Sequence, residues 1–201
     1  MFLNPQPSLI LASTSRYRKE LLERLGLGFS SVAPGVDESP AADERPSQLV
    51  TRLAKAKASA VALLHPQAWV IGSDQIAVLA TPGTPTILGK PGTEERCRAQ
   101  LHACSNTTVD YLTAVALMRH ETQQLIEFTD MTRVSFRKLD EATIARYIAK
   151  EQPLDCAGGF KSEGLGIALC NSIFNSDPSA LIGMPLIRLS AALRTAGFEI
   201  P

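Results

Sequence analysis

A chain of 201 residues with 45% hydrophobic, 20% charged and 5% aromatic residues can bury a core of its own, which excludes a disordered or fibrous protein. Twenty Lys and Arg balance twenty Asp and Glu, so no positive excess exists to hold a polyanion, and general nucleic-acid binding is not expected. No secretory leader, membrane-length apolar run or Cys-x-x-Cys spacing is visible, so we expect a cytoplasmic protein with reduced thiols and no membrane partner.

The chain opens with a pattern that predicts a strand, a turn and a helix. Residues 8–12 form a short, mainly apolar run, the turn Ser13-Thr14-Ser15 is rich in hydroxyls, and a helical pattern follows from Arg16. Free N–H groups at a helix start attract anions, and Arg18 in the first turn is unfavourable there unless an anion is bound. The alternative is that a serine caps the helix and the arginine is solvated.

A second strand is predicted at residues 29–33, followed by a polar, acidic loop over 34–46. Pro46 then suits the start of a long helix that runs to about residue 64. Lys57 falls on the apolar face of this helix, so its ammonium group must either reach solvent along the surface or meet an anion.

A buried strand is predicted at residues 69–71, and Ile76 to Leu79 resumes the extended pattern. Asp74 lies between the two apolar stretches. Ligands of α/β proteins gather beyond the carboxyl ends of strands, where a carboxylate can orient water or hold a cation. The alternative, which the short Gly-Ser-Asp segment favours, is an aspartate that tightens a turn.

The second half of the chain predicts helices and a β-hairpin around two glycine-rich segments. In order, these are a Pro/Gly-rich connection at 81–92 that contains Lys90, a helix at 93–104, strands at 107–118 and 125–136, a helix at 140–150, a glycine-rich stretch at 155–166 and a helix at 185–196. The hairpin interrupts a strict β-α-β order. We therefore expect an α/β fold with a mixed twisted sheet flanked by helices, in one domain over residues 1–201.

Six segments, in this order and spacing, resemble the Maf family of nucleoside triphosphate pyrophosphatases over nearly the whole chain. They are residues 9–18, Val36-Asp37-Glu38, residues 52–58, Gly72-Ser73-Asp74-Gln75, Gly89-Lys90-Pro91 and residues 157–164. The resemblance implies a fold similar to that of inosine triphosphate pyrophosphatases, with two lobes around a cleft. It also implies hydrolysis between the α- and β-phosphates of a nucleoside triphosphate with a divalent cation, Mg²⁺ or Mn²⁺, and makes a homodimer plausible.

The resemblance also assigns roles to individual residues. Asp74 would activate the attacking water, and Ser13, Arg18, Lys57 and Lys90 would bind phosphate. Ser15 of the hydroxyl-rich turn is a further candidate for phosphate binding. Because Mg²⁺ needs only one or two carboxylates beside substrate oxygens and water, Asp74 and Glu38 are the candidates to support the metal ion.

Three positions would set the substrate, namely Tyr17, Gln75 and Glu163, and this set is similar to that of the 7-methyl-GTP subfamily. A purine methylated at N7 is positively charged, so an aromatic ring and a carboxylate suit it. The subfamily commonly has Trp where this chain has Tyr17 and Pro where it has Arg16, so stacking is expected to be weaker here. The alternatives are a dTTP/UTP pyrophosphatase of the same family and a non-catalytic nucleotide-sensing regulator of cell division.

Overall fold

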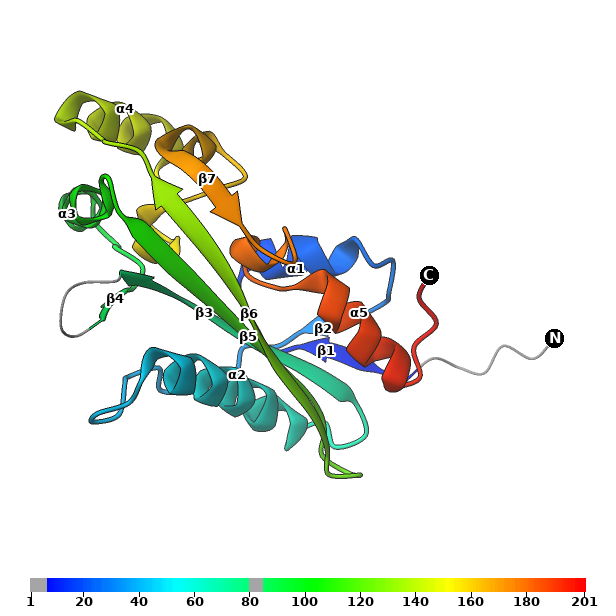
Figure 1. Ribbon diagram of the computed structural model, residues 1–201. Helices are drawn as coiled ribbons and strands as arrows, with labels where there is room; N and C mark the ends of the chain where they lie inside the picture. Colours follow the sequence, from blue (N-terminus) through cyan, green and yellow to red (C-terminus); the bar gives the residue numbers. More distant parts are fainter. Residues whose placement is uncertain (1–6, 80–84) are drawn as a thin grey trace. The chain divides into compact units, whose positions relative to one another are not determined.

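The computed structural model describes residues 7–79 and 85–201. Its helices and strands follow the predicted order, with short strands and 3-10 turns added (Figure 1). The elements are β1 (Leu9–Leu11), α1 (Arg16–Glu23), β2 (Ser30–Ser31), α2 (Pro46–Ala62), β3 (Trp69–Leu79), β4 (Thr86–Leu88), α3 (Glu94–Cys104), β5 (Thr108–Arg119), β6 (Gln124–Phe136), α4 (Glu141–Glu151), η1 (Ala157–Gly159), η2 (Leu165–Leu169), β7 (Cys170–Phe174), η3 (Ala180–Ile182) and α5 (Leu186–Thr195).

Within these residues the strands form one seven-stranded sheet in the order β2-β1-β3-β5-β6-β7, with β4 paired to β3. Strand β1 pairs in parallel with both β2 and β3, whereas β4 is antiparallel to β3 and β7 is antiparallel to β6. The mixed α/β sheet that the sequence predicts is therefore confirmed.

The chain divides into two compact units, each assembled from separate stretches of sequence. The first holds residues 1–74, 113–129 and 183–201, and the second holds residues 75–112 and 130–182. Strands β3, β5 and β6 each contribute residues to both units. The expectation of a single domain stays a prediction.

The first unit packs α2 closely against β1 and the start of β3. Its apolar cluster joins Ile10 and Val70 of the strands to Val61 of the helix. A Cβ atom at Gly72 would overlap the carbonyl oxygen of Ala54, so β3 can approach α2 this closely only because residue 72 is a glycine.

The second unit has its own larger core, to which α3, α4 and the strands contribute. Tyr111, Phe136 and Phe160 meet at its centre, with the rings of Phe136 and Phe160 edge to face at a centroid distance of 5.0 Å. The buried thiols of Cys97 and Cys104 belong to this core, and burial raises their pKa values to about 11 and about 12.

The starts of α3 and α4 agree closely with the sequence because each of these helices has a recognisable cap. The hydroxyl of Thr93 accepts from the backbone N–H of Arg96, and the Asp140 carboxylate accepts from that of Thr143. In the described residues, no helix is long and apolar enough to cross a membrane.

Candidate functional site

Lys57 is the buried centre of a charge cluster in the first unit. The apolar face of α2 carries it inward, and only 5% of the residue is exposed. Its Nζ lies 2.7 Å from Oδ1 of Asp74 and 2.7 Å from Oε1 of Glu38. Of the two outcomes that the sequence left open, the structure shows the second: the buried ammonium group meets anions.

The expectation that Asp74 tightens a turn or follows the end of a strand is wrong. Asp74 lies inside β3, which continues without a break from Trp69 to Leu79. Polar residues are tolerated in this buried strand because they are bonded, Ser73 to a backbone carbonyl group and Asp74 to Lys57. Burial raises the pKa of Asp74, while the positive charges of Lys57 and Arg18 oppose that change.

Glu38 reaches the cluster from the acidic loop, as a side chain that is 60% exposed. The loop is fixed to α2 by Arg52, which donates from Nε and Nη2 to the two carboxylate oxygens of Glu44, at 2.6 and 2.8 Å. Arg52 also donates to the carbonyl oxygen of Ser39, next to Glu38 in sequence. Arg52 therefore holds the loop that carries Glu38 against α2.

The hydroxyl-rich turn combines capping with a possible anion site. Ser15 is the N-cap of α1 and accepts from the backbone N–H of Arg18 at 3.5 Å, so this serine does cap the helix. The buried hydroxyl of Ser13 accepts from the backbone N–H of Ser15 at 3.1 Å. A hydroxyl group that accepts one bond can still donate, so both serines keep a proton for a ligand.

Arg18 is not simply solvated. Its Nε donates to the carbonyl oxygen of Gly183 at 3.2 Å. Its half-buried guanidinium also interacts electrostatically with the carboxylates of Asp74 and Glu38. Burial lowers the pKa of Arg18, and the two carboxylates oppose that change. The first unit thus brings together the charged side chains of Arg18, Glu38, Lys57 and Asp74.

Sequence reasoning missed Ser73 and Gly183. The buried Ser73 hydroxyl donates at 3.0 Å to the same Gly183 carbonyl oxygen that accepts from Arg18. Gly183 has φ +128°, which favours glycine. A glycine two residues before Pro185 is a weak turn signal, and nothing local in the sequence connects it with Ser73.

The second unit holds the other glycine-rich segments. Gly158 donates its backbone N–H to the carbonyl oxygen of Gly89 at 3.1 Å, and Gly92 donates to that of Leu154 at 3.0 Å. These bonds bring the exposed Lys90 loop beside the segment that leads to Glu163, which is also exposed. The start of the predicted 81–92 connection lies outside the described residues; its later part forms β4, which the sequence did not predict.

The remaining two specificity candidates are already engaged with protein groups. Gln75 donates both N–H bonds of its amide to carbonyl oxygens, of Ala180 at 2.9 Å and Leu181 at 3.0 Å. The Arg16 guanidinium lies 4.7 Å from the ring centroid of Tyr17 and donates to its hydroxyl group. The Gln75 side chain is therefore hydrogen-bonded to η3. One face of the Tyr17 ring contacts the Arg16 guanidinium.

Two carboxylates are the metal-binding groups that the cluster offers. In residues 7–79 and 85–201, no group of three or more His, Cys, Asp or Glu side chains is arranged to hold a metal ion. Asp74 and Glu38 nevertheless each use only one oxygen for Lys57. Because Mg²⁺ binds through one or two carboxylates together with water and substrate oxygens, this donor set fits it.

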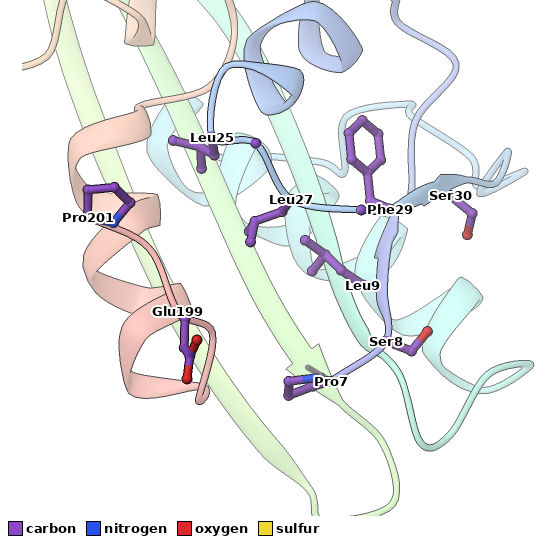
Figure 2. A pocket seen from close by; sticks show the side chains of 11 residues that line it. Pro7, Ser8, Leu9, Leu25, Leu27, Phe29, Ser30, Glu199 and Pro201 are labelled. Carbon is purple, nitrogen blue, oxygen red and sulfur yellow. The ribbon is translucent and has the colours of Figure 1, made fainter. Parts of the chain in front are cut away.

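A concavity of about 740 Å³ lies elsewhere in the first unit, between the strand β1, the segment after α1 and the C-terminal residues (Figure 2). Pro7, Leu9, Leu27, Phe29 and Glu199 are among its lining residues. It includes none of the predicted site residues and no lysine or arginine. Its lining therefore does not suit a polyphosphate.

An α/β protein with a buried lysine paired to a carboxylate, and a half-buried arginine under the electrostatic influence of that carboxylate, belongs to the class whose sites can take a phosphorylated ligand and transfer a proton. Comparison of the sequence with protein-family models defines the class more narrowly. The family model described as Maf-like protein matches residues 8–196, and the chain belongs to this family.

Two similar proteins of nearly equal length carry the same name. The chain is 52% identical over 195 residues to a "7-methyl-GTP pyrophosphatase" of Xanthomonas oryzae pv. oryzae, which covers 97% of this chain and 100% of the relative. A protein of that name from Pseudomonas aeruginosa is 49% identical over 195 residues, with 97% and 100% covered. A solved structure of a HAM1 protein from Coxiella burnetii matches with a TM-score of 0.44 and 18% identity, covering 65% of this chain and 73% of that one.

Proposed function

We propose that this protein hydrolyses 7-methyl-GTP between its α- and β-phosphates, releasing 7-methyl-GMP and pyrophosphate, and so removes a modified nucleotide. The Lys57 cluster is the observation that carries the proposal, because a buried lysine there holds an aspartate in place beside an arginine. The family membership and the shared name of full-length relatives support the same activity.

The side chains of the cluster divide the work between proton transfer and charge neutralisation. Asp74 accepts the proton of the attacking water, and its raised pKa makes it a better base than an ordinary aspartate. Arg18 and Lys57 balance the charge of the polyphosphate, and Ser13 and Ser15 donate to its oxygens. Lys90, exposed in its loop, is a further cation for the leaving pyrophosphate.

Asp74 and Glu38 would hold a divalent cation, either Mg²⁺ or Mn²⁺, through the oxygens that Lys57 does not use. When bound, such an ion polarises phosphate oxygens and lowers the pKa of bound water. Lys57 keeps the two carboxylates aligned whichever ion is present.

The methylated base is recognised by Tyr17 and Glu163. Its positive charge suits the aromatic face of Tyr17 and the exposed carboxylate of Glu163, which can also accept from the N–H groups of guanine. Gln75 contributes by holding Ala180 and Leu181 in place. Arg16 competes for the Tyr17 ring, which is a physical reason for weaker stacking in this chain.

The test is a pyrophosphate-release assay with Mg²⁺ over a panel of 7-methyl-GTP, GTP, dTTP and UTP. We expect 7-methyl-GTP to be preferred, and Asp74→Asn to bind it while kcat falls about a thousandfold. Asp110→Asn is the matched control, because the half-buried Asp110 pairs with Arg133 within the second unit. Release of orthophosphate, preference for dTTP or UTP, or an active Asp74→Asn variant would contradict the proposal.

A further inference from the structure

The last turn of α4 contacts the glycine-rich segment that carries Glu163. Resting on the proposed function, in which Glu163 recognises the base, we propose that Glu151 and Tyr147 are positioning residues for Glu163 and thereby help to set the substrate preference. All the contacts that support this lie within the second unit.

Glu151 fastens the segment on both sides of Glu163. Its Oε1 accepts from Nζ of Lys161 at 2.6 Å, and its Oε2 accepts from the backbone N–H of Leu165 at 2.6 Å. These partners stand two residues before and two residues after Glu163. The Glu151 side chain is only 11% exposed, so solvent competes weakly for these bonds.

The turn between those two anchors is closed on itself. Gly164 and Gly166 both donate their backbone N–H groups to the carbonyl oxygen of Lys161, at 3.3 and 3.1 Å. A Cβ atom at Gly164 would overlap the Glu151 carboxylate, and one at Gly166 would overlap the Lys161 carbonyl group. Gly164 is thus explained by close packing against Glu151, and Gly166 by the close approach of the Lys161 backbone; both contacts constrain the backbone that carries Glu163.

Tyr147 holds the segment one helical turn earlier, on the same face of α4 as Glu151. Its buried hydroxyl group donates to the carbonyl oxygen of Gly159 at 3.1 Å and accepts from the backbone N–H of Lys161 at 3.0 Å. Two side chains of one helix therefore fix the entry and the exit of the turn.

Glu163 itself remains available to a ligand. Its carboxylate is exposed and accepts from its neighbour Ser162 at 3.3 Å, and within the described part of the chain no cation pairs with it. Glu151 also keeps the ammonium group of Lys161 occupied, two residues away. Without Glu151, that ammonium group would be free to neutralise Glu163, and a cationic base would lose its partner.

The rigid turn also lowers the entropy lost on binding. A glycine-rich segment that is free in the unbound protein must be ordered when the ligand binds, whereas this one is ordered already. Loss of either anchor is therefore expected to weaken recognition of the base and to leave the phosphate chemistry of the first unit intact.

The experiment compares kcat and KM for 7-methyl-GTP and GTP, which share the same triphosphate. For Glu151→Ala we expect the ratio of the two kcat/KM values to fall about tenfold, through KM rather than kcat. Glu151→Gln keeps an acceptor for Leu165 and lacks only the charge, so its ratio should lie between those of the wild type and Glu151→Ala. This variant also tests the proposal if the alanine variant does not fold. Glu141→Gln, on the same helix but paired with Arg98 and His102, is the control and should leave the ratio unchanged.

Glu163→Gln is measured in the same experiment. It separates the role of Glu163 in base recognition from the positioning role of Glu151. A wild-type protein without the preference, or a preference that survives Glu163→Gln, overturns the role of Glu163 and this inference with it. If Glu163→Gln shifts the preference while both Glu151 variants keep it within about twofold of wild type, the inference alone is wrong.

Discussion

The carbonyl oxygen of Gly183 receives two hydrogen bonds that matter for the site, one from Arg18 and one from Ser73. Because Nε of Arg18 is used in this way, the direction of the guanidinium is set before a phosphate arrives. An arginine with a fixed planar fork loses less freedom on binding an anion than a solvated one. Ser73 therefore acts on phosphate binding through Gly183 and Arg18.

Ser73→Ala tests this chain of contacts. Removal of the buried hydroxyl group leaves the Gly183 carbonyl group free to shift, so KM for the triphosphate is expected to rise about fivefold while kcat changes little. Steady-state kinetics with 7-methyl-GTP measure both constants. Ser172→Ala, at an exposed position of β7, is the control, and equal KM values in the two variants would contradict the positioning role.

At the residue scale, the sequence is informative where a side chain conflicts with the pattern around it. Lys57 stood out because a lysine on an apolar helix face needs a partner, and the structure supplies two. Ser73 gave no such signal, since its partner lies 110 residues away in sequence. Contacts of this range depend on the tertiary fold, which no local pattern specifies.

At the scale of elements, the acidic loop depends on its attachment to α2. Glu44 accepts from Arg52 and from the backbone N–H of Ala41, and these bonds lower the pKa of Glu44 to about 2 from 4.5. A carboxylate with a depressed pKa stabilises the folded state above the unfolded value and loses that contribution as the pH falls.

We therefore expect the stability that Glu44 contributes to be complete above pH 4.5 and to disappear as the pH falls from 4.5 to about 2. Thermal unfolding of the wild type and of Glu44→Gln at a series of pH values measures it, because other titrating groups cancel in the difference. The difference in Tm should shrink across that interval. A difference independent of pH would show that the ion pair does not depress the pKa.

The sequence predicts the capped helices and the long strands closely. It does not predict the short strands β4 and β7. The capped helices α3 and α4 and the long strands β5 and β6 lie within a few residues of their predicted bounds. Strand β4 follows a Pro/Gly-rich stretch, and β7 has an exposed, irregular pattern, so their pairing with β3 and β6 comes from the neighbouring strands rather than from their own residues.

At the scale of the whole molecule, three strands run through both compact units. Melting of one unit would break the ladder of hydrogen bonds in strands that the other unit needs. We therefore expect a single cooperative unfolding transition.

The protein has its own probe for this expectation. Trp69, the only tryptophan, is buried in the first unit, whereas far-UV circular dichroism reports on the helices of both. Urea unfolding followed by the two signals should give the same midpoint and slope. A second transition seen only by circular dichroism would show that the second unit unfolds separately.

The unbroken course of β3 through Ser73, Asp74 and Gln75 has a consequence for how such a protein can diverge. Neighbouring side chains of a strand point to opposite faces, so the serine and glutamine hold the segment around Gly183 while the aspartate turns toward the lysine of α2. Exchanging one side chain alters the contacts of that residue and leaves the faces of the others unchanged. Inserting or deleting a single residue within the strand would move every following side chain to the opposite face. Substitutions in this strand are therefore tolerated more readily during evolution than insertions or deletions.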